Sequence, residues 1–112
     1  MAPVDLLQGT LDLLLLKALS WGPMHGYEVN RWIRTTSGEA LSVEEGALYP
    51  ALHRLEARGW VESEWGVTDQ NRQAKFYKLT RKGRRELQAE TDSWQRLSAA
   101  VARVLKAIEQ GA

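Results

Sequence analysis

The feature that most constrains this fold is a long helical segment at the C-terminal end of the sequence. Thr80 is placed to cap it, and the helical pattern continues to about residue 110. About thirty helical residues would span roughly 45 Å, more than so short a chain needs as cover. Its apolar residues recur at heptad-like spacing, as in a coiled coil: Leu87, Trp94, Leu97, Val101, Val104 and Ile108. We therefore expect this helix to pair with that of a second copy, as the interface of a homodimer.

Three shorter helices are predicted before it. The first covers about residues 8–20, where leucines recur every three or four positions, and Trp21-Gly22-Pro23 ends it. The second covers about residues 25–35, with Val29, Trp32 and Ile33 on its inner side.

The third helix is predicted to begin with a capping box, in which Ser42 is the N-cap and Glu45 the third helical residue. Its apolar stripe is Leu48, Leu52 and Leu55, and Gly59 supplies a left-handed stop. Pro50 lies inside this helix and should clash with the carbonyl four residues earlier. That residue is Gly46, which can yield, so a slight kink and no break is expected.

Residues 60–65 and 75–80 alternate as strands do, and residues 66–74 form a polar connection between them. The predicted order is therefore three helices, a hairpin and a long helix: a mainly α fold with a small β-hairpin. This is the winged helix-turn-helix pattern, in which the third helix reads the DNA major groove. Residues 1–80 would form the DNA-binding domain and residues 81–112 the dimerisation helix.

Composition excludes several functions. The chain has no cysteine and only two histidines, His25 and His53, so disulfides, thiolate catalysis and a metal site are not expected. No glycine-rich phosphate loop and no histidine–carboxylate pair at a useful spacing is found, so neither an enzyme nor a cofactor is predicted.

The apolar run Leu13-Leu14-Leu15-Leu16 is the longest in the chain. The stretch around it is interrupted by charges and is too short to span a bilayer. It also lacks the basic segment of a signal peptide. No membrane association and a cytoplasmic location are therefore expected.

Four motifs in order resemble the PadR family of bacterial transcriptional regulators. They are 6–12 (LLQGTLD), 22–28 (GPMHGYE), 46–56 (GALYPALHRLE) and 76–83 (FYKLTRKG). The resemblance covers about residues 6–105 and is strongest to the short branch with one C-terminal dimerisation helix, of a type common in acidobacteria. It implies a homodimeric winged-helix repressor that binds double-stranded DNA. Ala47 departs from the threonine or serine more usual there, which would remove one hydroxyl contact.

The third helix carries the first candidate DNA contacts. With its leucines buried, Tyr49, His53 and Arg54 are placed to donate to phosphates or base acceptors. Taken alone they would be read as an ordinary solvated face; the family pattern favours DNA contact.

The net charge is only +1, so any attraction to DNA must come from local clustering. Seven basic residues and no acidic one lie between residues 71 and 85. Arg72, Lys75 and Lys78 are the candidate phosphate contacts of the hairpin. The alternative is that these residues form a solvated surface balanced by nearby glutamates. Phosphate contact is favoured over this alternative for Arg72 and Lys75. The two interpretations are evenly matched for Lys78 and the basic residues that follow it.

Two aromatic features leave alternatives open. His25-Gly26-Tyr27 opens the second helix and would either bind a phosphate at its free amides or form a tight turn with Tyr27 in the core. Among the five tryptophans, we expect packing in the core for Trp21, Trp32, Trp60 and Trp65.

Trp94 follows Glu90 and Thr91, which interrupt the heptad seam. The indole either fills the dimer core, the favoured interpretation, or stacks a small planar aromatic effector. The resemblance points to such a site, because an aromatic residue at the corresponding place lines a pocket between subunits in several short PadR-like regulators. The alternative to a DNA-binding repressor is a winged-helix adaptor that binds proteins and not DNA.

Overall fold

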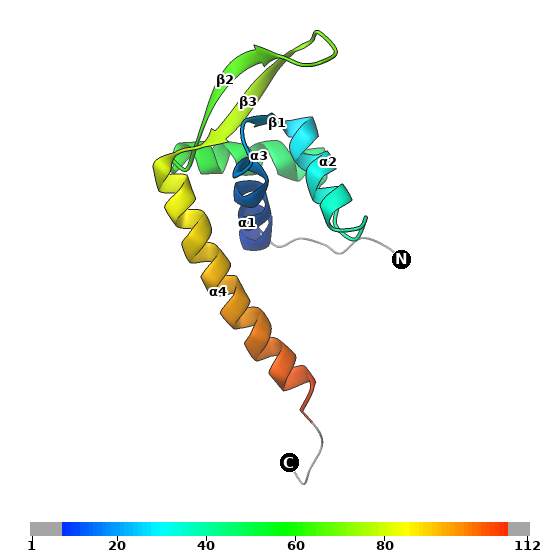
Figure 1. Cartoon of the computed structure of the whole chain (residues 1–112), viewed down its shortest axis with the longest axis vertical. Coiled ribbons are helices and arrows are strands. Elements are labelled where there is room, and N and C mark those ends of the chain that lie inside the picture. Colours follow the sequence, from blue (N-terminus) through cyan, green and yellow to red (C-terminus); the bar gives the residue numbers. More distant parts are fainter. Residues whose placement is uncertain (1–7, 108–112) are drawn as a thin grey trace.

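The computed structural model describes residues 8–107 of the chain. The elements follow in the order α1 (Gln8–Leu19), β1 (Met24–His25), α2 (Gly26–Thr36), α3 (Glu45–Ala57), β2 (Val61–Val67), β3 (Gln73–Leu79) and α4 (Arg81–Leu105). The first three helices form a body, β2 and β3 rise from it as a wing, and α4 projects away on the other side (Figure 1). This arrangement confirms the predicted winged helix-turn-helix with a long C-terminal helix.

The leucine-rich α1 is the centre of the hydrophobic core. It contacts α2, α3, β3 and α4, so apolar residues are needed around most of its circumference. Leu15, Leu16 and Leu19 are fully buried, and the α3 stripe of Leu48, Leu52 and Leu55 packs in the same cluster. The predicted inward faces of α1 and α3 are therefore confirmed.

The beginning of α3 differs from the prediction. Glu44 is the N-cap, its side chain makes no capping hydrogen bond, and the Ser42–Glu45 capping box does not form. Val43 is buried instead, and its N–H donates to Asn30 Oδ1 at 3.1 Å. Burial of Val43 against the core thus holds the preceding chain extended and delays the helix. From Glu45 the helix runs unbroken through Pro50 to Ala57, as predicted.

The sheet has three antiparallel strands in the order β1-β3-β2, where the sequence predicted two. The short β1 places Met24 opposite Tyr77 and His25 opposite Phe76. Two residues cannot show an alternating pattern, so this strand was not predictable from periodicity. It ties the start of α2 to the wing.

The wing alternates between an inner and an outer face. The inner face has Val61 opposite Leu79, Ser63 opposite Tyr77 and Trp65 opposite Lys75. Tyr77 and Leu79 point inward as predicted and are 1% and 6% exposed. Because β2 and β3 extend past the core, the positions nearer the tip are solvent-exposed.

The corner between the wing and α4 depends on two residues. The Thr80 hydroxyl donates to the Gly59 carbonyl at 2.6 Å and accepts from the Gly83 N–H at 3.0 Å, which confirms Thr80 as the N-cap of α4. A Cβ atom at Gly83 would overlap the carbonyl oxygen of Trp60. The glycine therefore allows α4 to cross directly over the start of β2. The predicted stop at Gly59 is confirmed by its φ of 78°.

Two of the four tryptophans assigned to the core are exposed. Trp32 and Trp60 pack against the core, whereas Trp21 and Trp65 are 68% and 69% exposed. Trp21 follows the last turn of α1, where the Lys17 ammonium lies 5.3 Å from its ring. Trp65 lies on the part of the wing that extends beyond the core. Their assignment to the core was wrong: Trp21 lies in the exposed turn after α1, and Trp65 lies on the wing beyond the core.

The first turns of α4 pack on the body and the remainder projects from it. Leu87 packs against the core of its own chain, and its place in a dimer interface stays a prediction. The helix ends at Leu105, five residues before the predicted end, and Ile108 lies outside the described residues. The projecting helix gives the molecule extents of 63 × 33 × 21 Å. In residues 8–107, no helix combines the length and apolar character needed to cross a membrane.

Candidate nucleic-acid interface

An open concavity of about 660 Å³ lies between the start of α2, the exposed face of α3 and the inner face of the wing. Its lining is aromatic and polar, with two basic residues and no carboxylate. The residues are His25, Gly26, Tyr27, Tyr49, His53, Trp65, Thr68, Gln70, Arg72, Gln73, Ala74, Lys75 and Tyr77. It brings together Tyr49, His53, Arg72 and Lys75, four of the six predicted DNA contacts.

The α3 side of the concavity is set by helical periodicity. With Leu48 and Leu52 buried, the next residue in each case, Tyr49 or His53, faces outward on adjacent turns. The Tyr49 ring lies against Gly26, where a Cβ atom would be 2.8 Å from its hydroxyl oxygen. The absence of a side chain at Gly26 therefore lets the tyrosine lie close to the start of α2. Tyr49 remains 42% exposed.

The wing side contributes the two basic residues. Lys75 is on β3 and Arg72 is in the turn between the strands. The Thr68 N–H donates to the Arg72 carbonyl at 2.8 Å, and the Thr68 hydroxyl accepts from the Arg72 N–H at 3.2 Å. Asn71 completes this tight turn with a φ of 60°. The guanidinium is therefore carried on an ordered turn at the mouth of the concavity.

Lys78 lies on the outer face of the wing. Its ammonium is 3.4 Å from Glu62, the residue opposite it on β2, and Glu64 lies on the same face. The alternation of β3 separates Lys78 from Lys75, so the structure does not bring it to the concavity. These carboxylates also make the outer face unsuited to a polyanion.

Arg54 is directed into the protein. One of its guanidinium nitrogens is 2.8 Å from Asp12 of α1, a residue only 7% exposed. Arg58 approaches the other oxygen of the same carboxylate at 3.8 Å. Asp12 requires a positive partner where it is buried, so Arg54 joins α3 to α1. We therefore withdraw Arg54 from the predicted DNA contacts.

Acidic residues of α4 extend this ion cluster. Burial, followed by a hydrogen bond and a charge interaction with Glu86, raises the pKa of Glu90 above its usual value, and Asp12 adds to the rise. The first half of α4 thus lies near Arg58, the residue that caps the C-terminal end of α3.

The start of α2 holds the residues that the sequence left ambiguous. Tyr27 is 65% exposed, so the alternative that placed it in the core is wrong. His25 caps the helix: its Nδ1 accepts from the Glu28 N–H at 3.4 Å, and Glu28 accepts from the His25 N–H at 3.2 Å. These contacts use groups that a phosphate would need, so we do not assign a phosphate to this helix end.

Sequence reasoning did not assign Tyr27, Trp65, Gln70 and Gln73 to the interface. The available signal was the inner-face alternation of β2 and β3, which places Trp65 beside Lys75 once the register is known. Tyr77 also lines the concavity. Burial, reinforced by the Glu56 carboxylate, raises its pKa, so it remains an uncharged hydrogen-bonding group.

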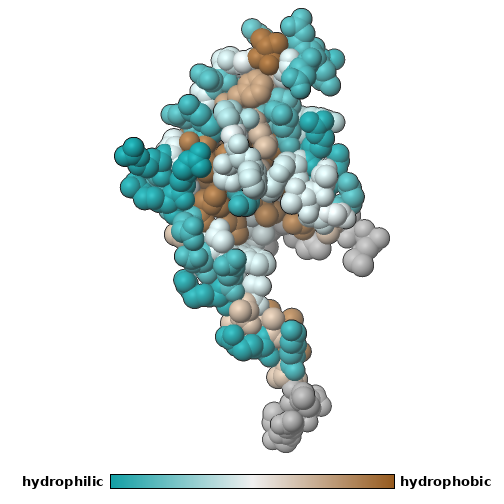
Figure 2. Space-filling model, viewed as in Figure 1, coloured by the Kyte–Doolittle hydropathy of each residue, from teal (hydrophilic) through white to brown (hydrophobic). Residues whose placement is uncertain are grey.

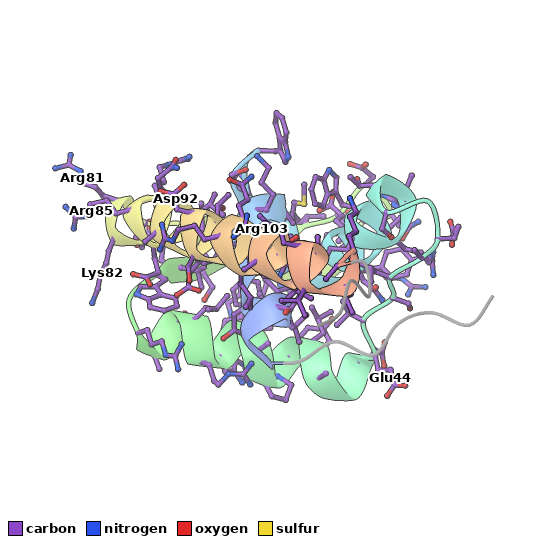
Figure 3. All side chains as sticks on the ribbon, turned by 90° about the horizontal axis from the view of Figure 1, so that it is seen from below. Glu44, Arg81, Lys82, Arg85, Asp92 and Arg103 are labelled. Atoms are coloured by element: carbon purple, nitrogen blue, oxygen red, sulfur yellow. The ribbon has the colours of Figure 1, made fainter. Side chains whose placement is uncertain are left out.

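The basic cluster continues from the wing into the start of α4. Arg81, Lys82 and Arg85 project together from this end of the helix (Figure 3). The first turn carries basic residues and no acidic one, and positive side chains at this end are unfavourable beside the positive end of the helix dipole. These basic residues of α4 do not line the concavity.

Among the described residues, no group of three or more histidines and carboxylates is placed to hold a metal ion.

The far half of α4 carries an exposed apolar stripe. Trp94, Leu97 and Val101 are 45%, 62% and 46% exposed, and Val104 and Leu105 continue the stripe. Trp94, Leu97, Ser98, Val101, Ala102 and Leu105 line a shallow, open groove of about 380 Å³. Hydrophobic atoms are visible at the surface of this part of the helix (Figure 2).

Comparisons with known proteins agree with this arrangement. A transcriptional regulator from Clostridium thermocellum superposes with a TM-score of 0.80 at 26% identity, over 88% of this chain and 96% of that one. A PadR-like transcription factor from Bacteroides fragilis gives 0.70 at 30% identity, over 87% and 91%. An uncharacterized 37.1 kDa protein of transposon Tn4556 from Streptomyces fradiae is 43% identical over 90 residues, which are 80% of this chain and 24% of that protein.

The model of the transcriptional regulator PadR-like family matches residues 15–89, which include α2, α3 and the whole wing. Proteins of this family are DNA-binding regulators and not enzymes, in agreement with the prediction from composition. The match covers most of the chain and every element of the concavity. The chain therefore belongs to the PadR-like family of transcriptional regulators.

Proposed function

We propose that the protein is a repressor that binds an inverted-repeat DNA site as a homodimer. The observation that carries this proposal is the concavity, where Tyr49 and His53 of the recognition helix α3 face Arg72 and Lys75 of the wing and no carboxylate intervenes. Side chains on α3 can reach base edges in the major groove, while the basic residues neutralise flanking phosphates. Residues 1–80 would bind DNA in the cytoplasm, and residues 81–112 would supply the dimer contact.

The exposed stripe of α4 supports the dimer. A helix that leaves Leu97, Val101 and Val104 in water lacks the cover that such residues usually receive. Their spacing of three and four is that of a coiled-coil seam, which a second copy of α4 can fill. Two-fold symmetry then implies two recognition helices and an inverted repeat.

A DNA-binding assay over a salt series tests the proposal. Tyr49→Ala or His53→Ala should weaken binding to a selected site by roughly tenfold and relax its specificity. Arg72→Ala or Lys75→Ala should weaken binding to all duplexes and lower the salt slope by about one each, because each releases one fewer counterion. Lys78→Ala is the matched control: it removes the same charge from the outer face and should leave the slope unchanged. Equal effects of Lys75→Ala and Lys78→Ala would contradict this interface.

A small aromatic effector is a second proposed property. The shallow groove beside Trp94 favours it, because a half-exposed indole can stack a planar compound between the two helices. Such a ligand would shift one α4 against its mate and change the distance between the recognition helices. In the same assay, planar aromatic cations or phenolic acids should then release DNA from the wild type but not from Trp94→Ala. Without release, Trp94 belongs to the dimer core alone.

A further inference from the structure

Trp65 is an exposed indole on the part of the wing that extends beyond the core. It lies on β2 and is 69% exposed, whereas the inner-face positions nearer the core include the buried Val61 and Tyr77. Val67, the next inner-face residue towards the tip of the wing, is 62% exposed. Figure 2 shows hydrophobic atoms near this tip, among hydrophilic ones. An apolar pair at this distance from the core contributes little to folding and is available to an external partner.

The surroundings of Trp65 define the chemistry of that partner. The indole lines the same concavity as Tyr49 of α3, and its cross-strand neighbour is Lys75. Arg72 lies in the turn that follows, and no carboxylate lines this face, whereas the outer face carries Glu62 and Glu64. A partner that meets an aromatic surface flanked by two cations is anionic along its backbone and apolar between its charges.

DNA has this pattern along its minor groove. Phosphates form the two rims, while the C–H edges of the deoxyriboses form apolar walls about 6 Å apart, wide enough for individual side chains. Aromatic and aliphatic side chains can pack in that groove, where basic residues pair with its phosphates. Lys75 and Arg72 are placed to contact the phosphates at the rims of this groove. Trp65 and Val67 are placed to pack on the deoxyriboses of its walls.

We propose that Trp65, with Val67 beyond it, is an apolar DNA contact of the wing. It packs on deoxyriboses of the minor groove that flanks the site read by α3, and it contributes binding free energy that does not depend on salt. This inference rests on the proposed DNA-binding function. It adds a residue that senses the width of the flanking minor groove, and therefore contributes to sequence preference outside the bases that α3 contacts.

The test compares two tryptophans of equal exposure. Trp65→Ala should weaken binding to a duplex selected by the wild type from a random pool by roughly tenfold, the scale of one lost aromatic stacking contact. The plot of log affinity against log salt should move down without a change of slope, because no phosphate contact is removed. Trp65→Phe should restore part of the affinity. Trp21→Ala, which removes an indole that is 68% exposed and lies outside the concavity, should bind as the wild type does.

A second arm identifies the groove. Replacing flanking G·C pairs by inosine·C pairs removes the minor-groove amino group and leaves the major groove unchanged. This replacement should strengthen binding by the wild type and have a smaller effect on Trp65→Ala. Thermal unfolding of each variant should match the wild type, since the exposed indole supports little of the fold.

The outcomes separate the inference from the function on which it rests. If the wild type and Trp65→Ala bind DNA with equal affinity, or if Trp65→Ala lowers the salt slope, the apolar contact is wrong while DNA binding by the protein stands. An equal response of both proteins to inosine would place Trp65 outside the minor groove and overturn the proposal. If the wild type binds no duplex, the proposed function and this inference fall together.

Discussion

At the scale of single residues, the absence of a side chain positions a functional one. Gly26 has no Cβ atom, and the Tyr49 ring occupies the space that one would fill. The motif of residues 22–28 at the start of α2 and the motif of residues 46–56 in α3 therefore contain the two partners of one contact.

Gly26→Ala should displace the Tyr49 ring and weaken DNA binding by about as much as Tyr49→Ala does. The cost in stability should be about 1 kcal/mol, at the low end for overpacking, because the half-exposed ring can swing outwards. The double variant should bind DNA no more weakly than Tyr49→Ala alone, since no ring remains to be displaced. Titration of the four proteins with DNA checks this. Gly9→Ala, with no atom within 4 Å of the added carbon, is the control for a helical glycine.

At the scale of elements, buried charge fixes how the recognition helix sits on the body. Asp12 of α1 is held by Arg54 and Arg58 of α3, and the Arg54 Nε atom is buried without a hydrogen-bond partner among the described residues. Removing Arg54 leaves the buried carboxylate with only the more distant Arg58 guanidinium, and removing the Asp12 charge leaves the Arg54 guanidinium without this partner.

Arg54→Met should therefore lower the free energy of unfolding by about 3 kcal/mol, and Asp12→Asn by a similar amount. The double variant should lose less than the sum of the two, which denaturant unfolding of all four proteins would measure. Below its unfolding temperature, Arg54→Met should keep the salt slope of DNA binding. A slope lowered by about one would place Arg54 on DNA after all.

At the scale of the whole molecule, α4 packs its first turns on its own body and leaves the apolar stripe of its far half exposed, where we propose that a second copy binds. Leu97→Asp combined with Val101→Asp would bury charges in the proposed seam, at a cost of several kcal/mol. Sedimentation of this double variant should show a monomer with intact secondary structure and much weaker binding to an inverted repeat. Ala99→Asp, an exposed position that does not line the groove, should leave the dimer intact. A dimer that survives the double substitution would refute the α4 seam.

The sequence alone determined the local order of the fold. Each of the signals that predicted it lies within a few residues. These signals are the spacing of leucines in α1 and α3, Pro23 and Gly59 just after the ends of these helices, and the N-cap Thr80. When burial recurs every 2 or 3.6 residues, apolar residues recur in the sequence at the same period. The helices, their inward faces and the type of fold could therefore be predicted. The two outward-facing α3 residues, Tyr49 and His53, followed from the same periodicity.

Only the tertiary structure decided which polar and aromatic residues share a surface. The sequence suggested Arg54 and Lys78 as DNA contacts. In the fold, α1 brings Asp12 to Arg54, and the register of the wing places Glu62 opposite Lys78. Trp65 looks like a core residue until the wing extends past the core. Each of these outcomes depends on a partner distant in sequence or on where the core ends. A local pattern gives the direction of a side chain, but the free energy of placing its charge or its ring is set by what the fold brings against it.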